Sequence, residues 1–322
     1  MKPVNTLLII AMATLVIVLT SPHLGFINTA NPEIQHHILT QLRIPRVLFA
    51  FIAGSGLAIC GMVFQAMFQN PLATPFTLGV ASGASLGASL YLYLGFSFTL
   101  LGIDGTTFAA FTGALIAISF VYAISRFRSG FSPETLLLTG VAISFFFSSL
   151  ILFIQYLSNV TDSFRILRWL MGGLTIVGYR DILQLLPFVT LSVAVILWLS
   201  RELNLLMAGD DIALSRGVAV QRMRYLLFFV TSLCVGAIVA LCGPIGFIGM
   251  MVPHICRLLI GSDHRWLIPA TILFGGGFLI LCDTIARLII APAEIPVGVI
   301  TTLLGGPFFL WLLIKFKALD RP

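Results

Sequence analysis

Eight stretches of the sequence contain no Asp, Glu, Lys or Arg, and they decide what the chain can fold into. These stretches are 3–32, 47–103, 105–125, 135–161, 182–200, 225–256, 266–282 and 295–314. A helix needs about 20 apolar residues to cross the hydrocarbon core of a bilayer. Only 9% of the residues are charged, whereas soluble proteins carry roughly 25%, so this chain cannot cover a water-facing surface. We therefore predict an all-α polytopic membrane protein.

Two of the stretches are long and are interrupted by polar or helix-breaking residues, so each is predicted to contain two spans or parts of two spans. Gln69-Asn70-Pro71 interrupts 47–103, and Gly243-Pro244 interrupts 225–256, after which a second span continues past Arg257. Together with six single spans, this predicts about ten transmembrane helices in one domain, 1–322. We interpret the first as a retained span because its apolar core is long for a signal peptide.

The placement of Lys and Arg predicts the orientation. Ten spans put both termini on one side, and that side then carries twelve of the 18 Lys and Arg residues. Because positive charge accumulates on the cytoplasmic side, both termini are predicted to be cytoplasmic. The net charge of +6 is explained by topology, and we expect no nucleic-acid partner. The other side receives Arg43, Arg46, Arg165, Arg168, Arg180 and Arg287.

Small residues along the second and third spans predict close helix packing, in preference to lining a path. Gly54, Gly56, Gly61, Gly83 and Gly87 are spaced along these two apolar stretches. Side chains of this size allow the backbones of membrane helices to approach one another closely.

The sequence contains no motif of an enzyme or a metal site. None of the three lysines follows a glycine, so there is no Walker A loop. The histidines and cysteines lack metal-ligand spacing. Asp283 is the one acid clearly inside an apolar segment, and Arg287 follows four residues later. We predict an internal ion pair between them, with a proton relay as the alternative. No catalytic residue, cofactor or metal is expected.

The loop of about 202–222 is the longest polar connection. Within it, Asp210 and Asp211 suit the positive end of a short helix, and Gly217 suits a left-handed cap at its end. This predicts a helix of roughly two turns. The loop is either a solvated connector or a docking element for a cytoplasmic partner that supplies energy.

Six long motifs in a fixed order give the chain a family resemblance. They are LRIPRVLFAFIAGSGLAICGMVFQAMFQNPLATPFTLGVASGASLG (42–87), LLLTGVAISF (136–145), LRWLMGGL (167–174), GDDIALSRGV (209–218), GPIGFIGMMVPHICRLLIGSDHRWLIPA (243–270) and DTIARLIIAPAEIPVGVITTLLGGPFFLWLLIK (283–315). With these motifs the chain resembles the permeases of ABC importers for iron chelates and cobalamin.

The resemblance implies a non-catalytic subunit of an ATP-driven importer. Such permeases pair, with an identical or paralogous copy, around a central path. Two ABC ATPase subunits bind on the cytoplasmic face, and a periplasmic or lipoprotein substrate-binding protein delivers the cargo. The expected location is the inner membrane. Because most members serve iron, the expected cargo is an iron(III)–siderophore complex, with haem or cobalamin as alternatives. An ion-coupled secondary transporter is the alternative from a different class.

The resemblance also assigns roles to arginines on the outer side. Arg43 and Arg46 match the R-x-P-R motif at the start of the second span, and Arg287 matches an arginine at the end of the ninth. In the family these positions receive glutamates of the binding protein, and a guanidinium group can hold a carboxylate through two hydrogen bonds. Lipid phosphate binding, or a local pair with Asp283, is the alternative.

On the inner side the resemblance implies a coupling region and a gate. Closure of the ATPases would push through the coupling helix on the sixth and seventh spans. The coupling match rests on Asp210, Asp211, Ala213, Leu214 and Gly217, with Ser215-Arg216 departing from the usual pattern. Pro133 and Glu134 stand where the cobalamin permease has small hydroxyl residues at its inner gate. They are either part of a gate or a plain helix start with Ser132 as N-cap.

Overall fold

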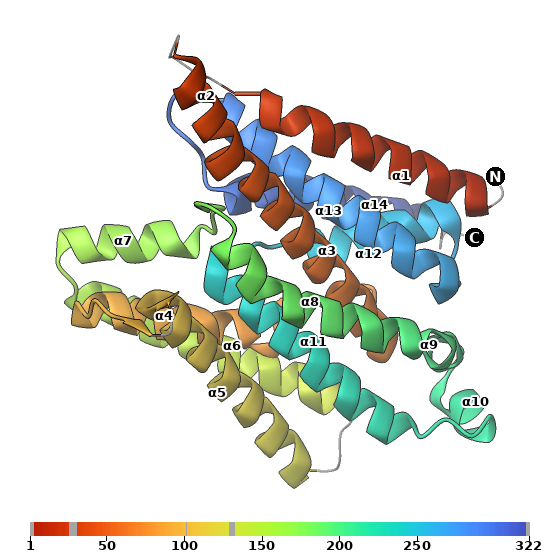
Figure 1. Cartoon of the computed structure of the whole chain (residues 1–322). Helices are drawn as coiled ribbons and strands as arrows, with labels where there is room; N and C mark the ends of the chain where they lie inside the picture. Colours follow the sequence, from red (N-terminus) through yellow and green to blue (C-terminus); the bar gives the residue numbers. More distant parts are fainter. Residues whose placement is uncertain (1–2, 26–30, 101, 129–132, 320–322) are drawn as a thin grey trace.

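The computed structural model describes residues 3–25, 31–100, 102–128 and 133–319. Within them the chain is a bundle of helices (Figure 1) with one short antiparallel hairpin. In chain order the elements are α1 (Pro3–Thr20), η1 (Ser21–His23), α2 (Pro32–Ile38), η2 (Leu39–Arg43), α3 (Ile44–Met67), η3 (Pro75–Leu78), α4 (Val80–Leu94), β1 (Thr99–Leu100), β2 (Ile103–Asp104), α5 (Gly105–Arg128), α6 (Pro133–Leu157), α7 (Val160–Leu170), α8 (Arg180–Trp198), α9 (Ser200–Met207), α10 (Asp210–Ser215), α11 (Val220–Cys242), α12 (Ile248–Ile260), α13 (His264–Leu288) and α14 (Val297–Leu319).

The predicted helical, polytopic class is confirmed. In the part of the chain that the structure describes, seven helical segments are long and apolar enough to span a membrane: α1, α2–α3, α5, α6, α8, α11 and α13. Three shorter apolar helices, α4, α12 and α14, coincide with the other predicted spans. The count of ten spans and the cytoplasmic location of the termini remain predictions.

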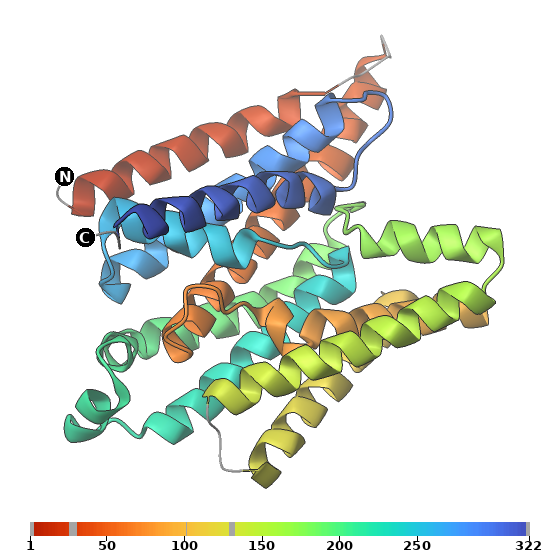
Figure 2. The same cartoon turned by 180° about the vertical axis from the view of Figure 1, so that it is seen from behind.

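Helix α3 occupies the centre of the bundle. Every residue from Ala53 to Met67 is buried, and the helix contacts α8, α11, α12 and α13. In Figure 1, α1, α12, α13 and α14 lie on one side of it and α4, α5 and α6 on the other, with α8 and α11 between. Figure 2 shows the opposite face, where α14 and α6 lie nearest to the viewer.

The two ends of the bundle carry different segments. Helices α2 and α7 lie at one end, whereas α9, α10 and the start of α1 lie at the other (Figure 1). The end of α14 lies at the same end as the start of α1 in both views. The segments predicted to be outer and inner are therefore separated by the length of the bundle.

Glycines allow the helix backbones to touch, as the spacing of small residues predicts. A Cβ atom on Gly61 of α3 would collide with the backbone of Gly249 in α12, and one on Gly54 would collide with the carbonyl oxygen of Gly275 in α13. In the α4–α5 pair, a Cβ on Gly83 would lie 2.5 Å from the carbonyl oxygen of Gly113. Close backbone contact of this kind stabilises helix pairs in membranes.

The predicted break at Gly243-Pro244 is confirmed. In the structure it contacts two other irregular segments, the connection after α7 and the start of α14. α11 ends at Cys242, Gly243 has φ +70°, and α12 begins at Ile248. The backbone NH of Gly173 donates to the Cys242 carbonyl at 2.8 Å, and that of Gly298 donates to the Gly172 carbonyl at 3.2 Å. The connection after α7, the break after α11 and the start of α14 thus join through main-chain atoms.

Candidate functional site

The three outer arginines predicted from the sequence come together in space. Arg43 closes η2, Arg46 lies in the first turn of α3, and Arg287 lies in the last turn of α13. All three line one hollow of about 330 Å³, whose wall also includes Gly25 and Glu294. Residues more than 240 positions apart in the sequence therefore form a single arginine cluster.

Arg46 is held by two carboxylates. Its Nε and Nη2 donate to Asp283 Oδ1 at 3.0 and 2.8 Å, and its Nη1 donates to Glu294 Oε2 at 2.7 Å. The Asp283 side chain is only 2% exposed, and that of Arg46 is 15% exposed. Burial strengthens such a pair and makes the loss of either partner costly. Arg46 is thus part of the fold as well as of the hollow.

Arg287 forms the ion pair that the sequence predicts. Its Nε donates to Asp283 Oδ2 at 3.1 Å, which confirms the i,i+4 pair. Its other nitrogens donate to Leu24 O and Ser21 Oγ, each at 3.2 Å, and so hold the end of α1. Arg43 donates to the Pro22 carbonyl at 3.1 Å. Three guanidinium groups face two carboxylates, Asp283 and Glu294, so the cluster keeps one positive charge in excess.

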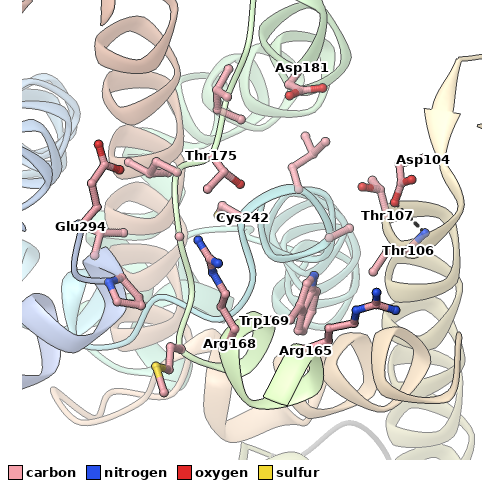
Figure 3. Close-up of a pocket in the computed structure, with 18 of the residues that line it drawn as sticks. Asp104, Thr106, Thr107, Arg165, Arg168, Trp169, Thr175, Asp181, Cys242 and Glu294 are labelled. Atoms are coloured by element: carbon pink, nitrogen blue, oxygen red, sulfur yellow. Dashed lines mark hydrogen bonds between the residues drawn. The ribbon is translucent and has the colours of Figure 1, made fainter. Parts of the chain in front are cut away.

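A larger cavity of about 890 Å³ adjoins the arginine cluster (Figure 3). Figure 3 shows Glu294 on one side, Asp104 and Thr107 on the other, and Arg168 between them. Arg46 and Glu294 line both this cavity and the smaller hollow. The sequence offered little reason to single out Glu294, because its partner Arg46 lies 248 positions earlier. Among the described residues, no group of three or more His, Cys, Asp or Glu side chains could hold a metal ion.

At the other end of the bundle, the predicted two-turn helix is confirmed as α10. Gly209 and Gly217, with φ of +122° and +81°, stand on either side of it. Ala213 is fully buried, whereas Leu214 is 57% exposed and Ile212 is 48% exposed. The helix therefore presents an apolar tip to the outside of the bundle.

The predicted coupling residues divide into two groups. Asp211 and Leu214 face outward, while Ala213 packs inward. Asp210 Oδ1 accepts a hydrogen bond from Arg224 Nη2 at 2.8 Å, so this carboxylate fastens α10 to the start of α11. Asp211 and Leu214 are thus available to a partner, whereas buried Ala213 and the Asp210–Arg224 salt bridge hold the helix in place.

The candidate gate residues lie at the start of α6. Pro133 is the first residue of the helix, and Glu134 is exposed in its first turn. Glu134 lines a hollow of about 440 Å³ together with Thr135, Thr139 and Ile143. Ser132, the predicted N-cap, lies outside the described residues. The gate and the plain helix start both remain predictions.

Comparisons with known proteins match nearly the whole chain. The profile of the FecCD transport family matches residues 5–315. The chain is 38% identical over 289 residues to the hemin transport system permease protein HmuU of Yersinia pestis, covering 89% of this chain and 86% of the relative. It is 42% identical over 287 residues to the cobalamin import system permease protein BtuC of Halobacterium salinarum, covering 88% and 74%.

Two further similarities extend this result. The iron(3+)-hydroxamate import system permease protein FhuG of Bacillus subtilis is 32% identical over 292 residues, covering 89% of this chain and 86% of the relative. A solved structure described as an inward-facing conformation of a metal-chelate type ABC transporter superposes with a TM-score of 0.87 at 31% identity. That superposition covers 97% of this chain and 99% of the solved chain.

Proposed function

This chain belongs to the FecCD transport family and is a permease of the ABC importer type, and we propose that its cargo is an iron(III)–siderophore complex or a related iron chelate. Two of the three relatives described above are named for iron compounds, hemin and iron(3+)-hydroxamate, and the third for cobalamin. The outer cavity of about 890 Å³ is in the size range of sites for bulky organic ligands. Haem and cobalamin are the alternative cargoes.

The observation that supports an importer, whichever cargo it carries, is the arrangement of the two ends of the bundle. The arginine cluster lies at one end of the bundle and the exposed tip of α10 at the other. An importer needs this separation, because cargo arrives on one face and energy is supplied on the other. An ion-coupled carrier is less well supported, because both oxygens of the buried Asp283 are occupied by Arg46 and Arg287.

We infer the following partners from the family. Two cytoplasmic ATPase subunits hydrolyse ATP and hold the tips of α10, and a second permease subunit completes the path. A periplasmic or lipoprotein binding protein places glutamates on Arg43, Arg46 and Arg287. The excess positive charge of this cluster suits a carboxylate. The complex resides in the inner membrane, and this chain itself performs no catalysis.

Vesicle uptake tests the function. The permease and the ATPase that copurifies with it are placed in liposomes with enclosed ATP, and binding protein loaded with ferric hydroxamate, haemin or cobalamin is added outside. We expect uptake of the iron chelate that requires ATP hydrolysis. Uptake driven by a proton gradient without ATP would contradict the importer, and uptake of haemin or cobalamin without uptake of ferric hydroxamate would replace the proposed cargo.

Changing the tip of α10 should uncouple ATP hydrolysis from transport. Leu214→Asp places a charge where an apolar side chain would enter the ATPase surface, and we expect about tenfold less chelate imported per ATP hydrolysed, or roughly 1.4 kcal/mol of lost coupling. Ser119→Ala, at an exposed position of α5 outside the 202–222 loop, is the control. Equal coupling in both variants would show that α10 does not transmit the ATPase motion.

A further inference from the structure

Two helices connect the outer arginine cluster with the inner α9–α10 segment. α3 and α13 lie side by side along the bundle (Figure 1). Gly54 and Gly275 bring their backbones into contact, and Ser55 Oγ donates to the Ile272 carbonyl at 2.8 Å. A helix of 25 residues such as α13 is about 37 Å long. The pair therefore spans the bundle as one closely packed unit.

At the outer end, a salt bridge joins the two helices. Arg46 of α3 and Asp283 of α13 are 2.8 Å apart, and Asp283 also holds Arg287 of the same helix. Any shift of α13 along α3 would stretch this buried pair. The geometry of the arginine cluster thus depends on how the two helices sit against each other.

At the inner end, Asn204 of α9 fastens that helix to the start of α13. Its Nδ2 donates to Asp263 Oδ1 at 2.8 Å, and its Oδ1 accepts from the His264 backbone NH at 2.9 Å. The His264 ring Nδ1 lies 2.7 Å from the same oxygen, and this ring is only 1% exposed. Asn204 therefore satisfies the first backbone NH of α13, beside the N-cap in which Asp263 accepts from the Arg265 NH.

Asp263 is a charged partner in this contact. The Arg265 backbone NH, at 3.0 Å, and then the Asn204 amide lower the pKa of the Asp263 carboxyl below its ordinary value. It is ionised at neutral pH, so Asn204→Asp adds a negative charge to the contact and Asp263→Asn removes one. This property makes the pair suitable for an exchange experiment.

Gln69 fastens the same segment to the end of α3. Its Nε2 donates to the Leu206 carbonyl at 3.0 Å and lies 3.4 Å from Asp210 Oδ1. Gln69 has φ +48°, a conformation that costs a non-glycine residue of order 1 kcal/mol and persists only where its surroundings hold it. The bond to α9 is such a restraint. Two independent contacts thus tie the α9–α10 segment to α3 and to α13.

We propose that the α3–α13 pair transmits movement between the α9–α10 segment and the outer arginine cluster, and that Asn204 and Gln69 are the positioning residues that attach the segment to it. The inference rests on the proposed function, which places an ATPase at α10 and a binding protein at the arginines. The family resemblance already implies that α10 pushes on α8 and α11, and the Asp210–Arg224 salt bridge joins α10 to α11. The α3–α13 pair is proposed as a second route in addition to that one. Coupling of this kind is reciprocal, so occupancy of either end shifts the other.

A reporter at the outer end makes the route measurable without the binding protein. Val177 is 71% exposed and lines the arginine hollow. All five native cysteines of the permease are buried, so maleimide attached to the permease chain reports on Val177→Cys. The permease–ATPase complex in nanodiscs is labelled with and without ATP and vanadate. In the otherwise native complex we expect nucleotide to change the labelling rate at least about threefold, or roughly 0.7 kcal/mol in free energy.

Variants of the two contacts decide the outcome. Asn204→Asp places two carboxylates together and should reduce the nucleotide response to less than about 1.3-fold, a limit near the noise of such rates. Asn204→Asp combined with Asp263→Asn restores one donor and one acceptor and should restore the response. Asn204→Ala with Gln69→Ala should abolish it, whereas Ser119→Ala, on the exposed face of α5, should leave it intact.

The labelling results distinguish failure of the transmission route from failure of the proposed function. A nucleotide response that is absent from the native complex, or that persists in the Asn204→Asp variant, would overturn the transmission route. If Asn204→Asp lowers ATPase binding, the double exchange carries the test, and failure of that exchange to respond would count against the route. A permease that binds no ATPase at all would instead contradict the proposed function.

Discussion

Replacing Arg46 by leucine should lower the free energy of unfolding by about 3–5 kcal/mol, because it leaves Asp283 buried with half of its partners removed. The same replacement at Arg43 should cost less, about 1.5 kcal/mol, because the Pro22 carbonyl to which it donates is neutral, whereas Asp283 is a buried charge. Thermal unfolding of the two variants in detergent, followed by intrinsic fluorescence, measures the difference.

The difference between Arg43 and Arg46 in stability also affects how their variants should capture the binding protein. Arg43→Leu should weaken capture of the loaded binding protein about tenfold, or roughly 1.4 kcal/mol, while the fold stays intact. Arg46→Leu would weaken capture too, through loss of the fold as well as of a docking group. Equal stability of the two variants would show that Asp283 does not depend on Arg46, and unchanged capture by Arg43→Leu would remove this residue from the docking surface.

Gly61→Val should prevent recovery of the folded permease. The added side chain would occupy the space of the Gly249 backbone, and neither α3 nor α12 has a flexible group there that could move aside. We expect a loss of about 3 kcal/mol or more in the free energy of unfolding. Size-exclusion chromatography of a fluorescent fusion reports the folded fraction directly.

A second glycine serves as the control for that experiment. Apart from its chain neighbours, a Cβ atom on Gly306 of α14 would meet no atom within 4 Å. Gly306→Ala should leave the folded fraction nearly unchanged, because the preference of a helix for alanine over glycine, up to about 1 kcal/mol, is opposed by contact of the new Cβ with the following Pro307 ring. Comparable yields of Gly61→Val and Gly306→Ala would show that the α3–α12 contact tolerates a wider separation.

The parts of the fold that the sequence predicts are those with local causes. Charge-free stretches predict spans because the bilayer imposes its thickness on each segment separately. The helix at 210–215 is predictable because Asp210, Asp211 and Gly217 act within one turn of its ends. The i,i+4 pair of Asp283 and Arg287 follows from helix geometry alone.

The parts that the sequence does not predict depend on which helices become neighbours. Asp283 meets Arg46 across 237 positions, and no periodicity connects them. The R-x-P-R motif predicts two docking arginines, but it gives no sign that the packing of α13 against α3 also makes Arg46 a structural residue. Asn204 has no local signal, because its partners Asp263 and His264 lie at the start of α13, beyond the two intervening spans α11 and α12.

Few substitutions are possible where Gly172, Gly243 and Gly298 meet. Three interrupted helices join there through peptide groups, so no side-chain chemistry is available to be exchanged. A Cβ atom on any of the three would strike a neighbouring main chain. At most positions a mutation is judged by polarity or charge, but here the volume of any added side chain decides, together with the positive φ of Gly172 and Gly243. Even alanine, the mildest replacement elsewhere, is a drastic one at this joint.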